Sequence, residues 1–180
     1  MQSQNLEDLK YPIGKFSKPE NISDEQIHDW ITDIDQFPNR LNKIVPYLSS
    51  SELNYRYRPE GWTIKQVVHH CADSHMNAFI RFKLCLTEEL PTIKTYVESK
   101  WAELPDAIEP DISHSLKLLE GLHARWVVLL KSLDAEALAK TYIHPERPQP
   151  MNILNTMALY AWHCNHHLAH IKQALEFKES

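Results

Sequence analysis

Apolar residues recur every three or four positions along four stretches of the chain, a spacing that predicts amphipathic α-helices. The first predicted helix starts after Ser23, which forms a capping-box pattern with Gln26. Pro38 lies inside this helix and should kink or break it, and Pro46 should end it near Leu48. Its apolar stripe consists of Trp30, Ile34, Phe37, Leu41, Ile44 and Val45.

Three further helices are predicted, over residues 63–88, 113–133 and 152–177. The second begins with the capping-box pair Thr63 and Gln66. The segments between the helices are rich in proline or polar residues. They are an extended arm at 1–22, a polar connection at 91–112 that has room for a short helical turn, and a loop at 141–151.

Four long helices with almost no alternating strand pattern predict an all-α fold, a four-helix bundle with an extended N-terminal arm. The chain has 180 residues, enough for one domain with a sizeable core. We therefore expect a single domain over residues 1–180.

Composition excludes several classes of function. The chain has only three glycines and no GxGxxG or Walker-type loop, which argues against nucleotide binding by the common routes. Its net charge is −5 without a basic run, so neither nucleic acid nor an acidic membrane surface is expected as a partner. No apolar run approaches the roughly 20 residues that span a bilayer. The three cysteines form no CxxC pair and the N-terminus lacks a signal-peptide pattern, so we expect a cytoplasmic protein with reduced thiols.

The sequence LYAWHCNHHLAH, at residues 159–170, places four histidines on one face of the last predicted helix. They form two i, i+4 pairs, each able to hold one metal ion. His163 and His167 lie nearer the apolar stripe and should face a partner helix. His166 and His170 lie almost opposite that stripe, on a flank or in solvent. On spacing alone, a solvated polar face is the more common interpretation of such a cluster, and the metal site is the alternative.

A third ligand is needed for a catalytic site of the zinc type, and the second helix offers VVHHCADSH at residues 67–75. His69 and His70 lie on opposite flanks of the apolar stripe, and periodicity does not choose between them. His75 lies in the stripe and is expected to be a hydrogen-bonded core histidine. The isolated histidines are expected at the surface or in loops: His28, His114, His123 and His144.

Cysteines and carboxylates near these histidines have alternative roles. Cys71 and Cys164 lie in or beside apolar stripes and are expected to be small core hydrophobes rather than thiolate ligands. Asp73 and Glu89 could accept hydrogen bonds from ligand rings, or could be solvated surface groups.

Several motifs in order resemble the YfiT-type metal-dependent hydrolases of the DinB-like superfamily, a group that includes bacillithiol transferases. The resemblance is carried by YPIGKF, GWTIKQVVHH, ADSHMN, RFKL, YIHP and the histidine-rich last helix, and covers nearly the whole chain. It implies a DinB-like four-helix bundle with one divalent metal per subunit, zinc or alternatively nickel. Carried onto this chain, the three ligands are His70, His163 and His167. The resemblance also implies a cytoplasmic homodimer.

One departure from the family pattern lies beside these positions. Asn165 stands where a further histidine is common, and Cys164 where a small polar residue is usual. Neither is an implied ligand, so the three-histidine site is retained, while the substrate and the surroundings of the ligands are left open.

Three functions remain open at this stage. The family description predicts a metal-dependent hydrolase that uses metal-activated water. The alternative is a metal-dependent thiol S-transferase, which would join a low-molecular-weight thiol resembling bacillithiol to an electrophile, because no carboxylate occupies an HExxH position to act as general base. The third is a non-catalytic metal-binding bundle. Either enzyme would act on a small molecule, through water or a thiolate rather than through a catalytic side chain that the sequence identifies.

Overall fold

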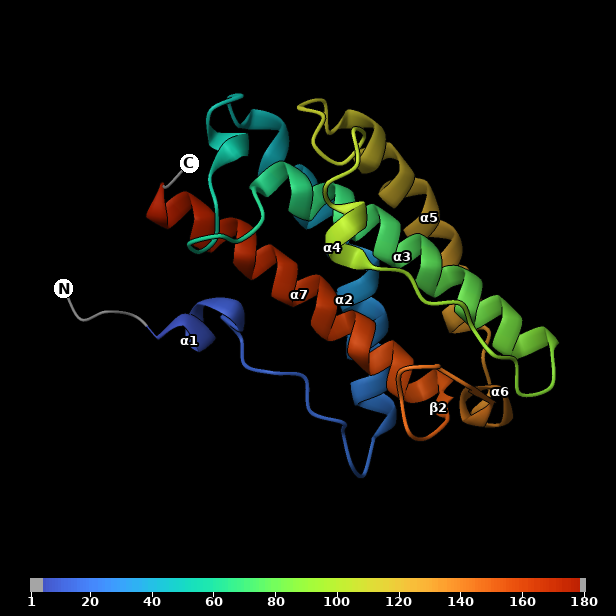
Figure 1. The fold of residues 1–180 in the computed structure, drawn as a ribbon. Coiled ribbons are helices and arrows are strands. Elements are labelled where there is room, and N and C mark those ends of the chain that lie inside the picture. Colours follow the sequence, from blue (N-terminus) through green and yellow to red (C-terminus); the bar gives the residue numbers. More distant parts are fainter. Residues whose placement is uncertain (1–4, 179–180) are drawn as a thin grey trace.

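Four long helices form the body of the protein in the computed structural model, which describes residues 5–178. They are α2 (Asp24–Asn42), α3 (Ile64–Thr87), α5 (Ser113–Lys131) and α7 (Ile153–Phe177). Helices α2 and α3 lie diagonally across the bundle. Each of them packs against both α5 and α7. Helix α7 runs antiparallel to α3 (Figure 1). The predicted all-α four-helix bundle is confirmed.

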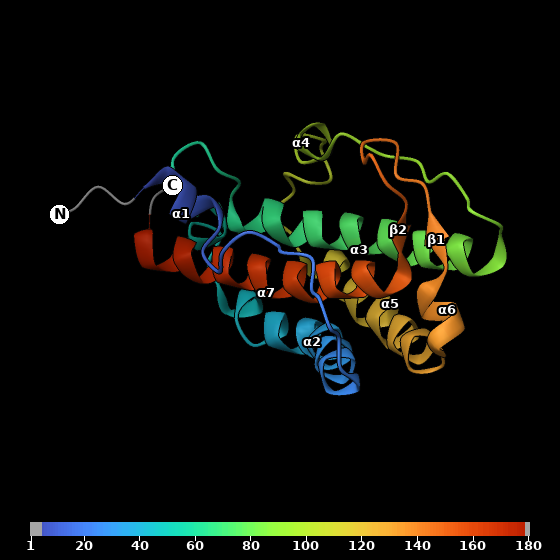
Figure 2. The same ribbon diagram turned by 90° about the horizontal axis from the view of Figure 1, so that it is seen from below.

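Shorter elements connect or cover these helices. They are α1 (Leu6–Lys10), the 3₁₀ turns η1 (Val45–Tyr47) and η2 (Glu52–Asn54), α4 (Glu98–Trp101), α6 (Ala135–Ala139), β1 (Thr141–Tyr142) and β2 (Met151–Asn152). The two strands pair antiparallel, which closes the segment predicted as a plain loop. Figure 2 shows that α4 and the β1–β2 loop lie on the same side of α3 and α7.

Capping chemistry explains where α2 and α3 begin. Ser23 and Thr63 each accept a hydrogen bond from the backbone N–H three residues later, and the glutamine at that position bonds back to the cap. Both predicted capping boxes are therefore confirmed. Helix α7 begins differently, with the Asn152 side chain accepting from the Asn155 N–H at 2.8 Å.

Helix α2 continues through Pro38, so the predicted break at this proline is wrong. The helix persists because its neighbours Phe37 and Leu41 are fully buried in the core. Proline has no N–H, so the carbonyl four residues earlier, that of Ile34, is left without its helical donor. Helix α2 ends at Asn42, earlier than the predicted end near Leu48, and Pro46 lies in η1 instead.

The core lies where the four helices meet. Its largest fully buried side chains include Trp126 of α5 and Phe82 of α3. Cys71, Cys85 and Cys164 are all free and buried within it, which confirms that Cys71 and Cys164 are core residues. Within residues 5–178, no helix combines the length and the apolar composition that crossing a bilayer requires.

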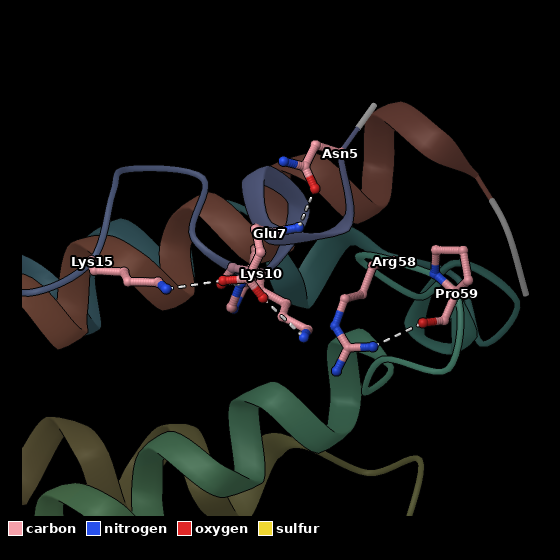
Figure 3. Close-up of polar contacts among 7 residues, drawn as sticks. Asn5, Glu7, Lys10, Lys15, Arg58 and Pro59 are labelled. Carbon is pink, nitrogen blue, oxygen red and sulfur yellow. Dashed lines mark hydrogen bonds and ion pairs between the residues drawn. The ribbon is translucent and has the colours of Figure 1, made fainter. Parts of the chain in front are cut away.

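The N-terminal arm lies along α7 and begins, within the described residues, with the unpredicted helix α1. Gln173 of α7 donates to the Leu9 carbonyl at 2.9 Å, and Trp162 donates to the Gly14 carbonyl at 3.2 Å. Glu7 forms ion pairs with Lys10 at 3.1 Å and with Lys15 at 3.0 Å (Figure 3). From Tyr11 to Ile22 the arm contains turns and irregular structure, and residues 1–4 of the predicted arm lie outside the described part.

Candidate metal centre

Two adjacent histidines of α3 face different helices, because successive residues are about 100° apart on a helix. The His69 ring lies against α5 and its flanking loop, with Nδ1 at 2.8 Å from the Ser115 hydroxyl and Nε2 at 3.0 Å from the Glu109 carbonyl. The His70 ring faces α7 and lies 5.4 and 4.9 Å from the rings of His163 and His167, centroid to centroid. His70 is thus the member of the pair that meets the histidines of α7.

The structure brings together the three residues that the sequence singled out. One ring nitrogen from each of His70, His163 and His167 lies within 4.8 Å of those of the other two. His70 and His167 are buried and His163 is half-buried. The three side chains come from two antiparallel helices, α3 and α7, whose packing fixes their separation.

Burial keeps these imidazoles neutral. It lowers the pKa of His70 to about 4, with a smaller contribution from His166. Burial also lowers the pKa of His163 and of His167 well below the ordinary value, and the neighbouring histidines lower it further. A neutral ring offers one lone pair, which is the form that binds a metal. At neutral pH the cluster therefore presents ligands rather than positive charges.

A chain of hydrogen bonds through the core determines which nitrogen of His163 is free. The Ile34 carbonyl can only accept, so His123 Nδ1 donates to it at 2.6 Å. Neutral His123 then accepts at Nε2 from His75 Nδ1, at 2.8 Å. His75 in turn accepts at Nε2 from His163 Nδ1, at 3.0 Å. This network assigns the proton of His163 to Nδ1 and leaves the lone pair on Nε2.

A second chain reaches His167 from the N-terminal arm. The Lys10 carbonyl accepts from His170 Nε2 at 3.1 Å, which leaves the lone pair of neutral His170 on Nδ1. His167 Nδ1 lies 3.4 Å from that atom and is assigned as its donor. The ring of His170 is held in place by stacking on Tyr57, with centroids 3.8 Å apart. His167 is therefore left with its lone pair on Nε2, like His163.

These residues fit a divalent metal ion. Both α7 rings have a protonated Nδ1 satisfied by another histidine, the arrangement by which metal-bound imidazoles are usually oriented. The His70 ring packs against Trp62, with centroids 4.7 Å apart. Three neutral nitrogen donors suit zinc and nickel, and three protein ligands leave a coordination position open.

A second group of histidines could also approach one ion. It consists of His166, His167 and His170, with ring nitrogens again within 4.8 Å of one another. His170 is already committed to the Lys10 carbonyl and to His167. His166 stacks on Trp162 at 4.3 Å between centroids, and its buried Nδ1 has no partner. We therefore take the group of His70, His163 and His167 as the candidate centre.

The structure corrects two expectations about histidines. His166 and His170 are buried rather than solvent-exposed, because the N-terminal arm and Tyr57 cover that flank of α7. His123 was expected at the surface but is 1% exposed in the core. The sequence signal for this burial was its helical spacing from the apolar stripe of α5, four residues after Leu119 and three before Trp126. His75 is a hydrogen-bonded core histidine as predicted, but its role in orienting His163 was missed.

The residues that depart from the family pattern lie away from the centre. Asn165 accepts from Arg40 Nη1 at 2.7 Å and donates to Asp33 at 2.8 Å, so it joins α7 to α2. Cys164 is fully buried, and burial raises the pKa of its thiol well above the ordinary value.

Neither acidic residue that could have supported the ligands does so. Asp73 lines a different cavity beside His69, where burial and then Asp106 raise its pKa to about 6. Glu89 is exposed at the end of the loop after α3.

Comparisons with known proteins identify the family of the chain. The family model described as the DinB superfamily matches residues 33–171. A Bacillus cereus (strain 03BB102) protein named "Putative metal-dependent hydrolase" is 52% identical over 166 residues, which cover 92% of this chain and 95% of the relative. A Bacillus anthracis (strain A0248) protein of the same name is 51% identical over the same coverage.

A solved structure is also similar. YfiT from Bacillus subtilis, described as "a probable metal-dependent hydrolase with an unusual four-helix bundle topology", superposes with a TM-score of 0.90 at 44% identity. The match covers 96% of this chain and 99% of that one. With the family model matching more than half its length, this chain belongs to the DinB superfamily, as a relative of YfiT.

Proposed function

We propose that this protein is a metal-dependent hydrolase of small molecules, with one divalent ion, zinc or alternatively nickel, held by His70, His163 and His167. The observation that carries the proposal is the convergence of three neutral ring nitrogens within 4.8 Å. The names of the relatives support the same class of activity. When bound, such an ion lowers the pKa of water toward neutrality and polarises a carbonyl group.

The protein's own residues would hold and orient the reacting groups. Ser74 is buried beside the centre, with its hydroxyl 3.5 Å from Nε2 of His163. Its backbone carbonyl accepts from the Tyr160 hydroxyl at 3.4 Å, which ties this turn of α3 to α7. With an ion bound to His163, the Ser74 hydroxyl would be free to donate to a substrate oxygen beside the centre.

A thiol S-transferase is the second candidate, and one feature favours it. Within the described residues, both groups of side chains able to hold a metal consist only of histidines. No carboxylate therefore stands among the ligands to remove a proton from water. A thiol, with a pKa of about 8.5, loses its proton far more readily than water does.

Metal content tests the centre itself. Purified wild-type protein should contain close to one equivalent of zinc or nickel, and His70→Ala, His163→Ala and His167→Ala should each lose most of it. His166→Ala is the matched control, since His166 neighbours the ligands in sequence but is not one of them, and its metal content should be unchanged. Normal metal content in all three ligand variants would contradict the proposed site.

Activity then separates the candidate functions. The zinc-loaded protein would be assayed with an aryl ester, and separately with a low-molecular-weight thiol plus an aryl chloride. Metal-dependent ester hydrolysis supports the hydrolase, whereas metal-dependent thioether formation supports the transferase. Turnover of neither, with stoichiometric metal, supports a non-catalytic metal-binding bundle. A homodimer stays a prediction of the resemblance, and a cytoplasmic location stays a prediction of the resemblance and of the cysteine pattern.

A further inference from the structure

A cavity of about 230 Å³ lies along the side of the bundle and reaches the candidate metal centre at His163, which is one of its lining residues. Helices α3 and α7 form its floor, with Ser74 and His163 at the end next to the centre. Helix α4 and the β1–β2 loop contribute its remaining walls, and Figure 2 shows both on this side of α3 and α7. The cavity is therefore placed to hold a molecule that reacts at the centre.

One stripe of α3 links the centre to the far part of this cavity. Ser74 and Arg81 follow His70 by four and eleven residues, which places all three within about 40° on the helix. At about 1.5 Å per residue, Arg81 lies roughly 10 Å beyond Ser74 along the helix axis. The same helix face thus carries a candidate ligand at one end and a guanidinium group at the other.

Arg81 has an unmet requirement for a hydrogen-bond acceptor. Its Nε is buried without a partner. Glu98 and Glu146 line the same cavity, yet the ion pairs within residues 5–178 involve other cations, namely Lys10, Lys15, Arg40 and His114. A buried polar group without a partner costs free energy, and because Arg81 also lines the cavity, a ligand bound there is placed to supply an acceptor to its guanidinium group.

We propose that Arg81 binds an anionic group of the substrate, a carboxylate or a phosphate, while the reactive group of that substrate lies at the metal centre. The planar guanidinium matches the two oxygens of either group. The cavity is smaller than the roughly 300–1,000 Å³ of sites for drug-sized ligands, so the substrate is a small molecule. This inference rests on the proposed function, because it names the class of substrate for the same site.

The test is a binding measurement on zinc-loaded, ¹⁵N-labelled protein. Succinate, inorganic phosphate and uncharged succinamide would each be titrated while the Arg81 Nε–Hε signal is followed by NMR. One of the two anions should shift this signal in a saturable way, and the one that binds more tightly identifies the anionic group. Succinamide should leave the signal in place.

Three variants show whether Arg81 is responsible. Arg81→Gln should weaken the dissociation constant of the preferred anion by about tenfold or more, the loss of a charge-assisted contact. Arg81→Lys keeps the charge but not the planar fork, and should bind with intermediate affinity. Lys83→Gln is the matched control, because Lys83 is an exposed cation two residues away on α3, and should change the constant less than about twofold. Circular dichroism confirms that each variant is folded.

The outcomes also separate this inference from the proposed function. Equal binding of succinamide, unchanged anion affinity in Arg81→Gln, or no anion binding at tens of millimolar would overturn the role of Arg81. Arg81-dependent anion binding by a protein that hydrolyses no ester would leave the subsite standing and reject the hydrolase. Metal-dependent hydrolysis with no preference for an anionic over a neutral ester would support the hydrolase and reject the anion subsite at Arg81.

Discussion

His163 and His167 are held by the same chemistry from opposite sides of the molecule. Each donates its Nδ1 proton to a second histidine, and each chain ends on a backbone carbonyl. The chain from His163 runs inward through His75 and His123 to α2, whereas the chain from His167 runs outward through His170 to the N-terminal arm. One ligand is thus anchored in the core and the other by a surface segment.

The two anchors differ in what they contribute besides orientation. The two inner rings of the core chain, His75 and His123, are buried between α2, α3, α5 and α7, so breaking the chain leaves buried polar groups without partners and destabilises the fold. The Ile34 carbonyl is available because Pro38 carries no N–H, so the proline within α2 is part of this anchor. The arm is attached by a few hydrogen bonds, and losing it should affect the centre more than the bundle.

The largest effect is expected from His75→Leu. This change removes the middle ring of the core chain and leaves the His163 N–H and the His123 lone pair without partners. Unpaired buried groups cost about 1–3 kcal/mol each, so the loss of two partners should lower the free energy of unfolding by about 2–6 kcal/mol. Zinc affinity should fall by about 10–100-fold. Urea unfolding and a zinc competition titration measure the two quantities. Unchanged zinc affinity would contradict the proposal that this hydrogen-bond chain orients His163.

His123→Phe should have a smaller effect at neutral pH. Phenylalanine can retain the stacking of His123 on Phe37, but it leaves the Ile34 carbonyl and the His75 N–H unpaired. Each of these two groups costs about 1–3 kcal/mol when left unpaired, but the buried apolar phenylalanine ring offsets part of that cost, so the expected net loss in the free energy of unfolding is about 1–3 kcal/mol. Because His75 still contacts His163, zinc affinity should fall by less than about tenfold. A loss of zinc affinity equal to that of His75→Leu would contradict this ranking.

The same variant should also change how stability depends on pH. Burial lowers the pKa of His123 to about 4 in the folded protein, against about 6.5 in an unfolded chain. Between these values the unfolded chain binds a proton that the folded protein does not, so stability falls as pH decreases. Removing His123 should make this fall shallower by up to about 1.4 kcal/mol per pH unit. Urea unfolding at a series of pH values from 7 to 4.5 provides the comparison, and parallel curves would refute a neutral buried His123.

His170→Phe sharpens the comparison from the side of the arm. The new ring can still stack on Tyr57, but it cannot accept from His167 or donate to the Lys10 carbonyl. Zinc affinity should fall about tenfold, while the urea midpoint should move much less than in His75→Leu. A stability loss as large as that of His75→Leu would show that the arm is as integral to the fold as the core chain.

Asn165→Ala should have the smallest effect on the centre. It removes the contacts of Asn165 with Arg40 and Asp33, which are partly exposed, so about 1 kcal/mol of stability should be lost. Zinc affinity should stay within about twofold of the wild type, as measured by the same competition titration. A large loss of affinity would mean that the residue at this position acts on the ligands after all.

The pattern of the sequence predicted the helices well because their signals are local. Capping boxes at Ser23 and Thr63 and the apolar stripes depend on residues three or four apart. The continuation of α2 through Pro38 could not be predicted from local signals, because it depends on the long-range packing of Phe37 and Leu41 in the core. Helix α1 was missed because five residues carry too little periodicity.

Periodicity identified the inward pair of α7 but left His69 and His70 open, and the family resemblance chose His70. The structure places that ring against α7, for a reason that lies in the packing of two helices far apart in sequence. The burial of His166, His170 and His123 likewise depends on segments more than 80 residues away, namely the arm and α2. A helical wheel describes one helix and contains no information on what covers it.

The most direct test of the central claim is the protonation state of each ring in the zinc-loaded protein. Long-range ¹H–¹⁵N NMR spectra of the histidine rings should show a proton on Nδ1 and zinc on Nε2 for both His163 and His167. The spectra of His75 and His123 should also show protons on Nδ1, and that of His170 a proton on Nε2. Zinc bound through Nδ1 of either α7 ligand, or a proton on Nε2 of His75, would contradict the account.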